Sequence, residues 1–560
     1  MAPALSTLAL AATLHAAYTF AGSSGSHAIH LDVPSTCEGA SIKHSPSYTS
    51  FSFEPAFWVE FFGNLTEPNT FTFGAINTLI EHGLRPVIRP GGITMDSLIF
   101  EPTAGDPVRT TSPAGGVYRT TVGPAYYESW SNFPNGTDFV STLNFGNDSL
   151  DIARDMAVAS VEYQPDLIKY FELGNEPTNY PPARWANSTE NYVRQWQNWT
   201  AEIDAAVNGR SKGEWWASSA TTDETPLHVR PADLIPAGIN SGGEVAEYSI
   251  HSYAFATCDP ERAALATTAN ILNHTGLVEY ADTEIVPSAQ AALDSGKPWI
   301  IGEFNSIACS GQPNVSDSFA QALWEVDTEL IYAVRNASAT YLHQGATLVF
   351  QSNQQTNSAG DDGTPGFSTY SMLYPVTSSK RGEQRTLPGF AGILFLAEAF
   401  AVQDTQIRAL PTPEGLSEDH FSAYAFYLGD RLTKLALINI RPYHANSTSD
   451  YAASFKLPSQ SKHGRFSRGQ KAYAKRMTAP HVDEKDSSKV TWAGQSFKNG
   501  TSVEEVAIEQ IGKDDIVTVR GSEALLIFFD QDECYGLESP TKGKSWGRRW
   551  RHWWSRSSSV

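Results

Sequence analysis

Short apolar runs alternate with longer amphipathic segments between residues 57 and 345. The apolar runs have the length of buried strands in a parallel sheet. Helical periodicity separates them, and residues 317–336 place apolar side chains at Phe319, Leu323, Val326, Leu330 and Val334. Eight strands are predicted, at residues 57–62, 85–89, 139–145, 169–173, 214–218, 246–252, 298–302 and 339–343. Eight β/α repeats predict an α/β fold, a (β/α)8 TIM barrel with its chemistry at the carboxyl ends of the strands.

The pattern changes after a last predicted helix at residues 388–402. Short β-like runs separated by turn residues follow, at 423–428, 435–440, 452–457, 490–492, 506–508, 516–519 and 524–529. They predict a C-terminal antiparallel β-sandwich domain over residues 404–535, behind a catalytic barrel over residues 51–403. Residues 22–50 are predicted to join the β-domain through an added N-terminal strand.

Two of the predicted strands end in a glutamate. The run that ends in Gly174-Asn175-Glu176-Pro177 is stopped by proline, so Glu176 leaves the end of strand four. Glu303 follows strand seven in the same way. Two carboxylates at the same end of one barrel are what a retaining glycoside hydrolase needs, one as proton donor and one as nucleophile.

We assign Glu176 as the general acid/base and Glu303 as the nucleophile. Repulsion between the two carboxylates separates their pKa values, and burial helps to keep the proton on the acid. Asn175 is predicted to bind the sugar 2-hydroxyl. Tyr253, at the end of strand six, is predicted to donate to Glu303 and orient it. The alternative for each glutamate is a structural ion pair with an arginine.

Two further strand ends carry candidate substrate-binding groups. Arg89-Pro90-Gly91-Gly92-Ile93-Thr94-Met95-Asp96 follows strand two, where Asp96 is predicted to hold sugar hydroxyls and Arg89 to form the floor of the site. Gln344 and the amide of Gly345, after strand eight, are predicted to reach the substrate. A structural turn at the first and a barrel histidine with a turn glycine at the second are the alternatives.

Three features indicate a secreted, extracellular protein. The apolar, small-residue N-terminus predicts a signal peptide over residues 1–21. Ten Asn-X-Ser/Thr sequons occur, at Asn64, Asn135, Asn147, Asn187, Asn198, Asn273, Asn314, Asn336, Asn446 and Asn499. The four cysteines are too far apart in the sequence for a zinc site and could form two disulfides. If the added N-terminal strand joins the β-domain, the hypothesis is a pairing of Cys37 with Cys534 and of Cys258 with Cys309. No other segment is long and apolar enough to predict a transmembrane helix.

The net charge of the chain restricts the ligands that it can bind. The formal net charge of -21 argues against a nucleic-acid ligand and against a long, highly sulfated one. Residues 536–560 differ from the rest, because tryptophans alternate there with lysines and arginines. They predict either a disordered tail or a contact with a cell wall or surface.

These landmarks together resemble clan A glycoside hydrolases, and more narrowly family 79, the β-glucuronidases and heparanase-like enzymes of secreted fungal type. The resemblance rests on Arg89 with Gly91-Gly92 and Asp96, Gly174-Asn175-Glu176-Pro177, His251-Ser252-Tyr253, Gly302-Glu303-Phe304-Asn305-Ser306 and Leu342-His343-Gln344-Gly345. It implies the same roles for Glu176 and Glu303, and no metal or organic cofactor. It also implies a glycan substrate with a terminal β-linked glucuronic acid, plain or 4-O-methylated. Its carboxylate would be held near strand eight, where Tyr374 is a candidate.

Two alternatives to an exo-acting β-glucuronidase stay open on the sequence. An endo-acting, heparanase- or hyaluronidase-like hydrolase would need a basic cleft for its polyanion, which the acidic composition disfavours. A non-catalytic carbohydrate-binding protein would rely on the β-domain and the tryptophan-rich tail instead.

Overall fold

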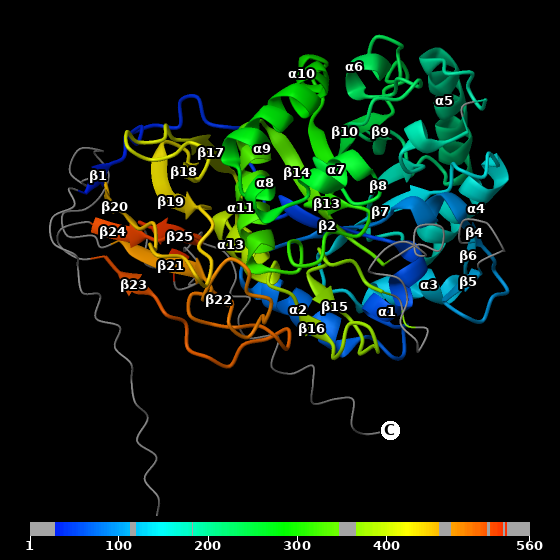
Figure 1. Ribbon diagram of the computed structural model, residues 1–560. Helices are drawn as coiled ribbons and strands as arrows, with labels where there is room; N and C mark the ends of the chain where they lie inside the picture. The colour runs from blue at the N-terminus through cyan, green and yellow to red at the C-terminus, as the bar shows by residue number, and fades with distance from the viewer. Residues whose placement is uncertain are drawn as a thin grey trace, which may run out of the picture.

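The computed structural model describes residues 28–111, 119–181, 183–346, 364, 366–458, 472–511, 516–529 and 533–534. It consists of an α/β barrel with a β-domain packed on one side (Figure 1). The predicted signal peptide and the basic tail lie outside the described residues. No helix in the described ranges combines the length and apolarity needed to cross a membrane.

The barrel is closed by eight strands, each hydrogen-bonded in parallel to its neighbours. In chain order they are β2 (Thr49–Phe53), β3 (Val87–Pro90), β7 (Asp138–Leu143), β8 (Ile168–Leu173), β9 (Trp215–Ala220), β10 (Val245–Ser252), β12 (Trp299–Phe304) and β14 (Ala337–Gln344). The predicted fold class is confirmed; Glu176 follows the fourth barrel strand, and Glu303 lies in the seventh. All eight strands are almost wholly buried, which explains why they appear as apolar runs in the sequence.

The first predicted strand is wrong. Residues 57–62 are helical, in η1 (Pro55–Phe57) and α1 (Trp58–Phe62), and the first barrel strand lies earlier, at β2. Pro55 occupies the first helical position, where its missing N–H costs nothing, and Trp58, Phe61 and Phe62 then share one buried face at helical spacing. Serines in β2 alternate with phenylalanines and weaken the apolar signal of the true strand.

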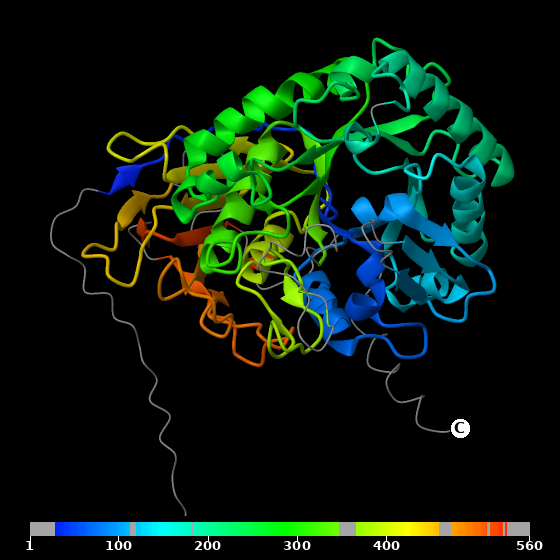
Figure 2. The same ribbon diagram turned by 45° about the vertical axis from the view of Figure 1, so that its right-hand side comes forward.

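Helices cover the outside of the barrel, with the strands at its centre (Figure 2). The longer ones are α2 (Thr70–Glu81), α4 (Leu150–Tyr163), α5 (Thr189–Ala206), α10 (Val286–Asp294), α11 (Phe319–Val334) and α13 (Phe390–Ala399). Shorter helices are α3 (Pro124–Glu128), α6 (Pro231–Leu234), α7 (Pro260–Leu265), α8 (Thr268–Ile271) and α9 (His274–Tyr280), and a small sheet, β4 (Leu98–Phe100), β5 (Val108–Thr111) and β6 (Arg119–Val122), follows the second barrel strand. Residues 319–333 of α11 are all buried, because this helix has the barrel on one side and α13 and β17 on the other.

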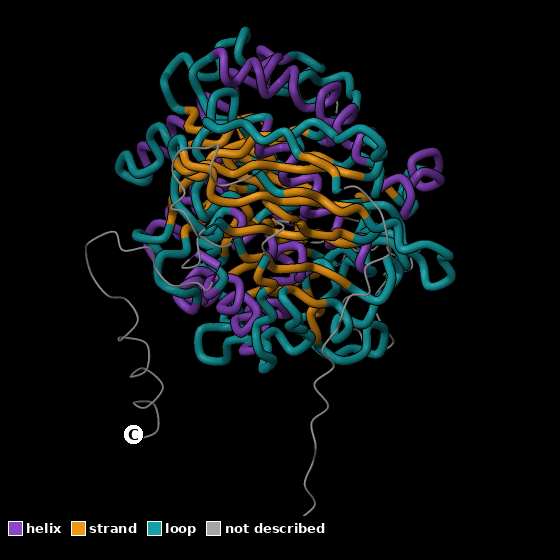
Figure 3. The backbone as a smooth tube through the Cα atoms, turned by 90° about the vertical axis from the view of Figure 1, so that its left-hand side faces the viewer, coloured by secondary structure: helices purple, strands orange, loops and turns teal. Residues whose placement is uncertain are grey.

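The β-domain contains two sheets, seen in front of the barrel in Figure 3. The larger runs in the order β17 (Thr405–Ala409), β18 (Phe421–Leu428), β19 (Arg431–Asn439), β25 (Glu523–Phe528), β21 (Tyr473–Thr478), β22 (Thr491–Trp492), and β23 (Glu509–Gln510) pairs with β21. The smaller has β1 (Ile29–His30), β20 (Ala453–Lys456) and β24 (Ile516–Val519). The predicted N-terminal strand is therefore present, as β1, and pairs in parallel with β20. Phe421 and Phe455 stack between the sheets, with ring centroids 4.9 Å apart.

A buried ion cluster joins the barrel to the β-domain. Glu398 of α13 accepts hydrogen bonds from Lys475 of β21 at 2.7 Å and from Trp492 of β22 at 2.9 Å. His82, at the end of α2, lies 2.7 Å from the same carboxylate. A charge on Glu398 is tolerated without water because three partners from two domains surround it.

One of the two predicted disulfides is present. Cys258 and Cys309 are bonded, with their Cα atoms 5.9 Å apart. The Cys37–Cys534 pairing is wrong, since both thiols are free. Cys37 donates to Asp430 in the β18–β19 turn at 3.4 Å, whereas Cys534 is buried beside the charged groups of the interdomain cluster.

Candidate active site

A cleft of about 320 Å³ opens at the carboxyl ends of the barrel strands. Each of five strands supplies one titratable side chain to it. They are Glu54 after β2, Glu176 after β8, His251 in β10, Glu303 in β12 and His343 in β14. Parallel strands end together at the same face of a barrel, so residues up to 289 positions apart meet in one cavity.

Glu303 is held as a carboxylate by donors from two sides. Arg89 donates to its Oε2 at 2.9 Å, and Tyr253 donates to its Oε1 at 3.0 Å. Burial alone would raise the pKa of Glu303, but His343, His251 and Arg89 outweigh it and lower this pKa to about 2. Gly302 allows β10 to lie this close, because a Cβ there would be 2.0 Å from the hydroxyl of Ser249. Glu303 is therefore a charged carboxylate in a nearly dry environment.

Arg89 forms the floor of the site and is wholly buried. Its guanidinium donates to Glu172 at 2.6 Å and 3.2 Å, to Glu303 at 2.9 Å, to Asn175 at 3.0 Å and to Ser52 at 2.9 Å. A planar group with five N–H donors suits this set of partners, and a lysine could not reach them all. The pKa of Arg89 is raised by Glu172 and Glu303 although burial opposes it.

Glu176 has the opposite protonation preference. Burial first, and then the charge of Glu303, raise the pKa of Glu176 to about 8, although Arg89 opposes the shift. The residue has a left-handed backbone, with φ 47° and ψ 62°, and precedes the short helix η4 (Pro177–Asn179). This uncommon conformation turns the chain out of β8, and Asn179 then donates to Glu176 Oε2 at 2.9 Å. At neutral pH, Glu176 keeps its proton while Glu303 is charged.

A neutral histidine lies between the two carboxylates. His251 Nδ1 is 3.0 Å from Glu176 Oε1 and 4.0 Å from Glu303 Oε2. Burial lowers the pKa of His251 to about 4. Its Nε2 is buried without a partner among the described residues, so we assign the proton to Nδ1, since an unpaired lone pair costs less than an unpaired N–H. His251 then donates to Glu176 without adding charge to the site.

One carboxylate oxygen of Glu176, one of Glu303 and a ring nitrogen of His251 lie within 4.8 Å of one another. This separation suits a proton donor and a nucleophile that act on the same sugar ring with retention, for which about 5–5.5 Å is typical. The same spacing would suit a cation by geometry. However, Arg89 already supplies a positive charge to Glu303, and Glu176 is protonated, so the donor set fits a metal ion poorly.

Glu54 was missed in the sequence, because it follows the strand whose position was mispredicted. Its carboxylate accepts from the backbone N–H groups of Ile93 and Thr94, each at 3.0 Å. Gly92, with φ 132°, makes this approach possible, since a Cβ there would lie 2.4 Å from the Glu54 carboxyl carbon. His343 lies 3.7 Å from Glu54 and 3.6 Å from Glu303, and these two carboxylates raise its pKa against the effect of burial.

The other predicted substrate-binding residues divide into two groups. Asn175 and Gly345 line the cleft. Asp96, Gln344 and Tyr374 are not among the described residues that line it, so their contacts with a substrate stay predictions.

Each of these three side chains has another use. Tyr180 donates to Asp96 at 2.5 Å, and the backbone of Asn175 donates to it at 3.2 Å, so Asp96 supports the turn below Glu176. Gln344 bridges the His343 carbonyl and the Met372 N–H. Tyr374 packs between the guanidinium groups of Arg381 and Arg385, with centroid distances of 5.3 Å and 4.9 Å.

Tyr370 and Ser368 line the cleft and were missed in the sequence. They come from a segment anchored by Thr369, which donates to the carbonyl of Ser310 through both its backbone and its side chain, at 2.9 Å and 3.1 Å. Ser310 directly follows Cys309, so the disulfide, this segment and the cleft wall are connected. No strand or helix pattern marks the segment, and its hydroxyl-rich composition is the one signal that could have indicated binding.

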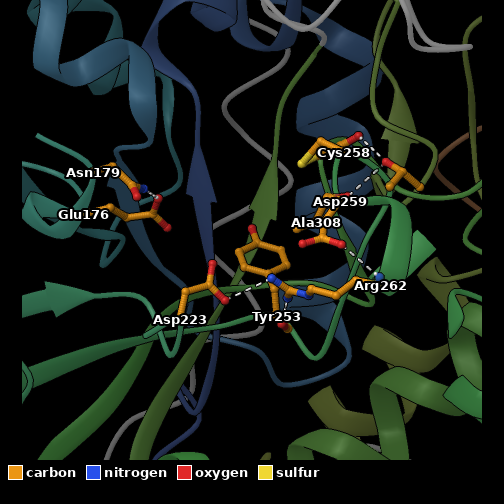
Figure 4. The surroundings of a disulfide bond; sticks show 10 residues. Glu176, Asn179, Asp223, Tyr253, Cys258, Asp259, Arg262 and Ala308 are labelled. Carbon is orange, nitrogen blue, oxygen red and sulfur yellow. Dashed lines mark hydrogen bonds and ion pairs between the residues drawn. A yellow bond between two sulfur atoms is a disulfide. The ribbon is translucent and has the colours of Figure 1, made fainter. Parts of the chain in front are cut away.

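The rim of the cleft carries an ion pair next to the disulfide (Figure 4). Arg262, from the short helix α7, donates to Asp223 Oδ1 at 2.9 Å. The same guanidinium donates to the backbone carbonyl of Tyr253. Arg262 therefore connects the loop after β9 to the residue that orients Glu303.

A closed (β/α)8 barrel with a protonated and a charged glutamate at the ends of its fourth and seventh strands defines the class of retaining glycoside hydrolases of clan A. Comparisons with known proteins narrow this class. Residues 423–526 match the family model described as the glycosyl hydrolase family 79 C-terminal beta domain. The chain is 27% identical to a beta-glucuronidase of Aspergillus niger over 85% of its length and 86% of the relative. It is 26% identical to a beta-glucuronidase of Neurospora crassa over 72% of its length and 74% of that protein.

A solved structure has the same fold. It is a 4-O-alpha-L-rhamnosyl-beta-D-glucuronidase from Fusarium oxysporum, with a TM-score of 0.72 and 20% identity, and the match covers 89% of this chain and 100% of the other. The chain is a glycoside hydrolase, and the match of its C-terminal β-domain to family 79 agrees with the resemblance seen in the sequence.

Proposed function

We propose that this protein is an exo-acting, retaining β-glucuronidase that removes terminal β-linked glucuronic acid, or its 4-O-methyl form, from glycans. One observation carries the proposal: a Glu176 that holds its proton and a Glu303 that holds its charge lie within 4.8 Å in the same cleft. Three secreted-type features of the sequence support an extracellular site of action.

In the first step, Glu176 donates its proton to the glycosidic oxygen while Glu303 attacks the anomeric carbon. The bond to the leaving group breaks and a covalent glycosyl-enzyme forms at Glu303. Esterification removes the charge of Glu303, and that charge is one of the causes that raise the pKa of Glu176. The pKa of Glu176 therefore falls in the intermediate, and the carboxylate can take a proton from the incoming water.

The surrounding residues have supporting roles in this proposal. Tyr253 and Arg89 hold both oxygens of Glu303 in place. The oxygen of Asn175 is engaged by Arg89, so its NH2 group is the part that can donate to the sugar 2-hydroxyl. That hydrogen bond strengthens as positive charge develops on the ring.

Recognition of glucuronic acid needs donors for the carboxylate at C5. Gly345, Ser368 and Tyr370 line the strand-eight side of the cleft and offer hydroxyl and backbone donors. Burial raises the pKa of Tyr370, so its hydroxyl remains a donor. The two curated relatives are both beta-glucuronidases, and the solved structure from Fusarium oxysporum is a 4-O-alpha-L-rhamnosyl-beta-D-glucuronidase in complex with Rha-GlcA.

The sequons support secretion. All ten of their asparagines lie in the described part of the chain, and all are exposed or partly exposed, as glycosylation requires. A contact of residues 536–560 with a cell wall or surface stays a prediction.

A panel of aryl β-glycosides that differ only at C5 tests the function. The glucuronide should be hydrolysed, while the glucoside, xyloside and galactoside should be turned over far more slowly. Retention is read from the anomer first released, by NMR. Turnover of the glucoside or xyloside at or above the rate of the glucuronide would refute the substrate, and release of the inverted anomer would refute the mechanism.

A further inference from the structure

In the ion pair between Arg262 and Asp223 at the rim of the cleft, Asp223 is the more exposed residue. The Asp223 side chain is 58% exposed, whereas that of Arg262 is 26% exposed. In Figure 4 the Arg262 side chain extends from α7 past Tyr253 to meet Asp223. A ligand entering the cleft therefore meets the carboxylate more than the guanidinium.

The guanidinium of Arg262 is also committed to protein groups. It donates to Asp223 and to the carbonyl of Tyr253. Among the described residues that line the cleft, Arg262 is the one arginine, and no lysine occurs. Asp259 lines the same rim, where its carboxylate caps α7. The entrance thus lacks a free cation in the described structure and has two carboxylates.

Asp223 belongs to the side of the cleft where the leaving group must lie. It is among the charges that act on Glu176, and the loop that carries it, with Thr221 and Thr222, borders the Glu176 turn. The hydroxyls of Thr178 and Thr221 are 3.4 Å apart and connect the two. Since Glu176 delivers its proton to the glycosidic oxygen, the group that departs with this oxygen lies next to that loop.

We propose that Asp223, held in place by Arg262, determines specificity for the leaving group: glycans whose penultimate sugar is neutral are accepted, and those whose penultimate sugar carries a sulfate or carboxylate are rejected. This inference rests on the proposed glucuronidase function and specifies its substrate class. The physical cause is repulsion between the exposed carboxylate and an anion a few ångströms away. The hydroxyls of Thr221 and Thr222 offer hydrogen bonds to a neutral sugar instead.

Two disaccharides test this role of Asp223: β-glucuronosyl-galactose, and the same compound with a sulfate on the galactose. Wild-type enzyme should give a kcat/KM ratio of roughly 10 or more in favour of the neutral compound at low ionic strength. Asp223→Asn should reduce this ratio by roughly threefold to tenfold, and raising the salt to about 0.5 M should reduce it in the wild type, because salt screens exposed charges. All rates are measured near pH 5, where Glu176 is protonated with either residue at 223.

Glu224→Gln is the matched control. Glu224 is the next acidic residue along the chain and is 84% exposed, but it does not line the cleft. Its substitution should leave the ratio at the wild-type value. An unchanged ratio in Asp223→Asn, an equal fall in Glu224→Gln, or a wild-type ratio that salt does not alter would each overturn the inference.

Hydrolysis of a neutral aryl glucuronide shows whether a negative result concerns the role of Asp223 or the proposed glucuronidase function. If the wild type hydrolyses the aryl glucuronide but does not discriminate between the disaccharides, the inference on Asp223 fails and the glucuronidase function stands. If no glucuronide is hydrolysed, the proposed function fails and the inference fails with it.

Discussion

Arg89 Nη1 lies 2.9 Å from Glu303 Oε2, in a position where the guanidinium is wholly inaccessible to water. The other edge of the same guanidinium binds Glu172, so one buried cation compensates two buried carboxylates. Removing one partner of a buried pair costs far more than an exposed pair contributes, because the remaining charge loses its compensation without gaining water.

Arg89→Gln should therefore weaken both folding and catalysis. We expect a loss of about 3–5 kcal/mol in the free energy of unfolding, measured by urea denaturation. The pKa of Glu303 should rise, which moves the acidic limb of kcat/KM to higher pH. Arg89→Lys is the matched control; it keeps the charge but not the five donors, and should recover stability more than activity. A Gln variant with wild-type kcat would contradict the role of Arg89.

The pH dependence of kcat/KM should be limited by Glu176 on the alkaline side. Its pKa of about 8 means that the protonated acid is lost above this pH, and activity should fall about tenfold per further unit. The charge of Asp223 contributes to raising this pKa, so Asp223→Asn should move the alkaline limb to lower pH. If the residual activity of Glu176→Gln falls at the same alkaline pH as that of the wild type, another group controls the alkaline decrease in kcat/KM.

Chemical rescue with azide distinguishes the two glutamates. Glu176→Ala and Glu303→Ala should each lower kcat on an aryl glucuronide by roughly 10²-fold or more. In Glu303→Ala, azide replaces the nucleophile and should yield the α-glucuronosyl azide. In Glu176→Ala, azide attacks the glycosyl-enzyme and should yield the β-azide. The opposite assignment of products would exchange the two roles.

Glu329, on α11, should make the protein less stable as the pH rises. Burial raises its pKa to about 8, against the opposing hydrogen bonds from Thr49 at 2.5 Å and Thr340 at 2.8 Å. Its pKa is higher in the folded than in the unfolded chain, so its contribution is complete below about pH 4.5 and is lost as the pH rises through 8. One such group changes the free energy of unfolding by up to about 1.4 kcal/mol per pH unit.

Glu329→Gln tests this contribution, because the amide keeps the shape of the carboxyl group and does not titrate. The variant should lose less of its melting temperature between pH 5 and pH 8 than the wild type does. Glu279→Gln, an exposed residue with no described ionic partner, is the control. Parallel melting curves for the wild type and Glu329→Gln would contradict the prediction.

The disulfide should support activity as well as stability. Cys258 and Cys309 lie just beyond the short strands β11 (Phe255–Ala256) and β13 (Ile307–Ala308), which come after β10 with Tyr253 and β12 with Glu303. The residue after Cys309 anchors the segment with Tyr370. Cys258→Ser with Cys309→Ser should lower the free energy of unfolding by up to about 4 kcal/mol, the chain-entropy value for a loop of this length. We also expect a lower kcat. Cys37→Ser, which removes an unbridged thiol, should leave kcat unchanged; an equal loss there would contradict the assignment.

The barrel and the catalytic pair were predictable because both depend on local patterns. Strands buried on both faces give continuous apolar runs. Asn175-Glu176-Pro177 ends one of these runs with a glutamate followed by a proline, which marks the strand end in the sequence. The first strand was missed because Ser50 and Ser52 interrupt its apolar run, while the phenylalanines of α1 imitate a strand. Asp96 was chosen because it follows a glycine turn, and Tyr374 because of the family resemblance. The partners that hold these two side chains in the fold left no signal in the sequence.

Sequence by itself determined the order of strands and helices in this protein, and with it that Glu176 and Glu303 emerge at the same end of a barrel. Tertiary structure decided their opposite protonation states. The pKa of a carboxylate depends on the water around it and on charges a few ångströms away, and here those charges come from Arg89 and His343, on two other strands distant in the chain. Long-range electrostatics of this kind leave no periodic signal in a sequence, because they exist only after the barrel has closed.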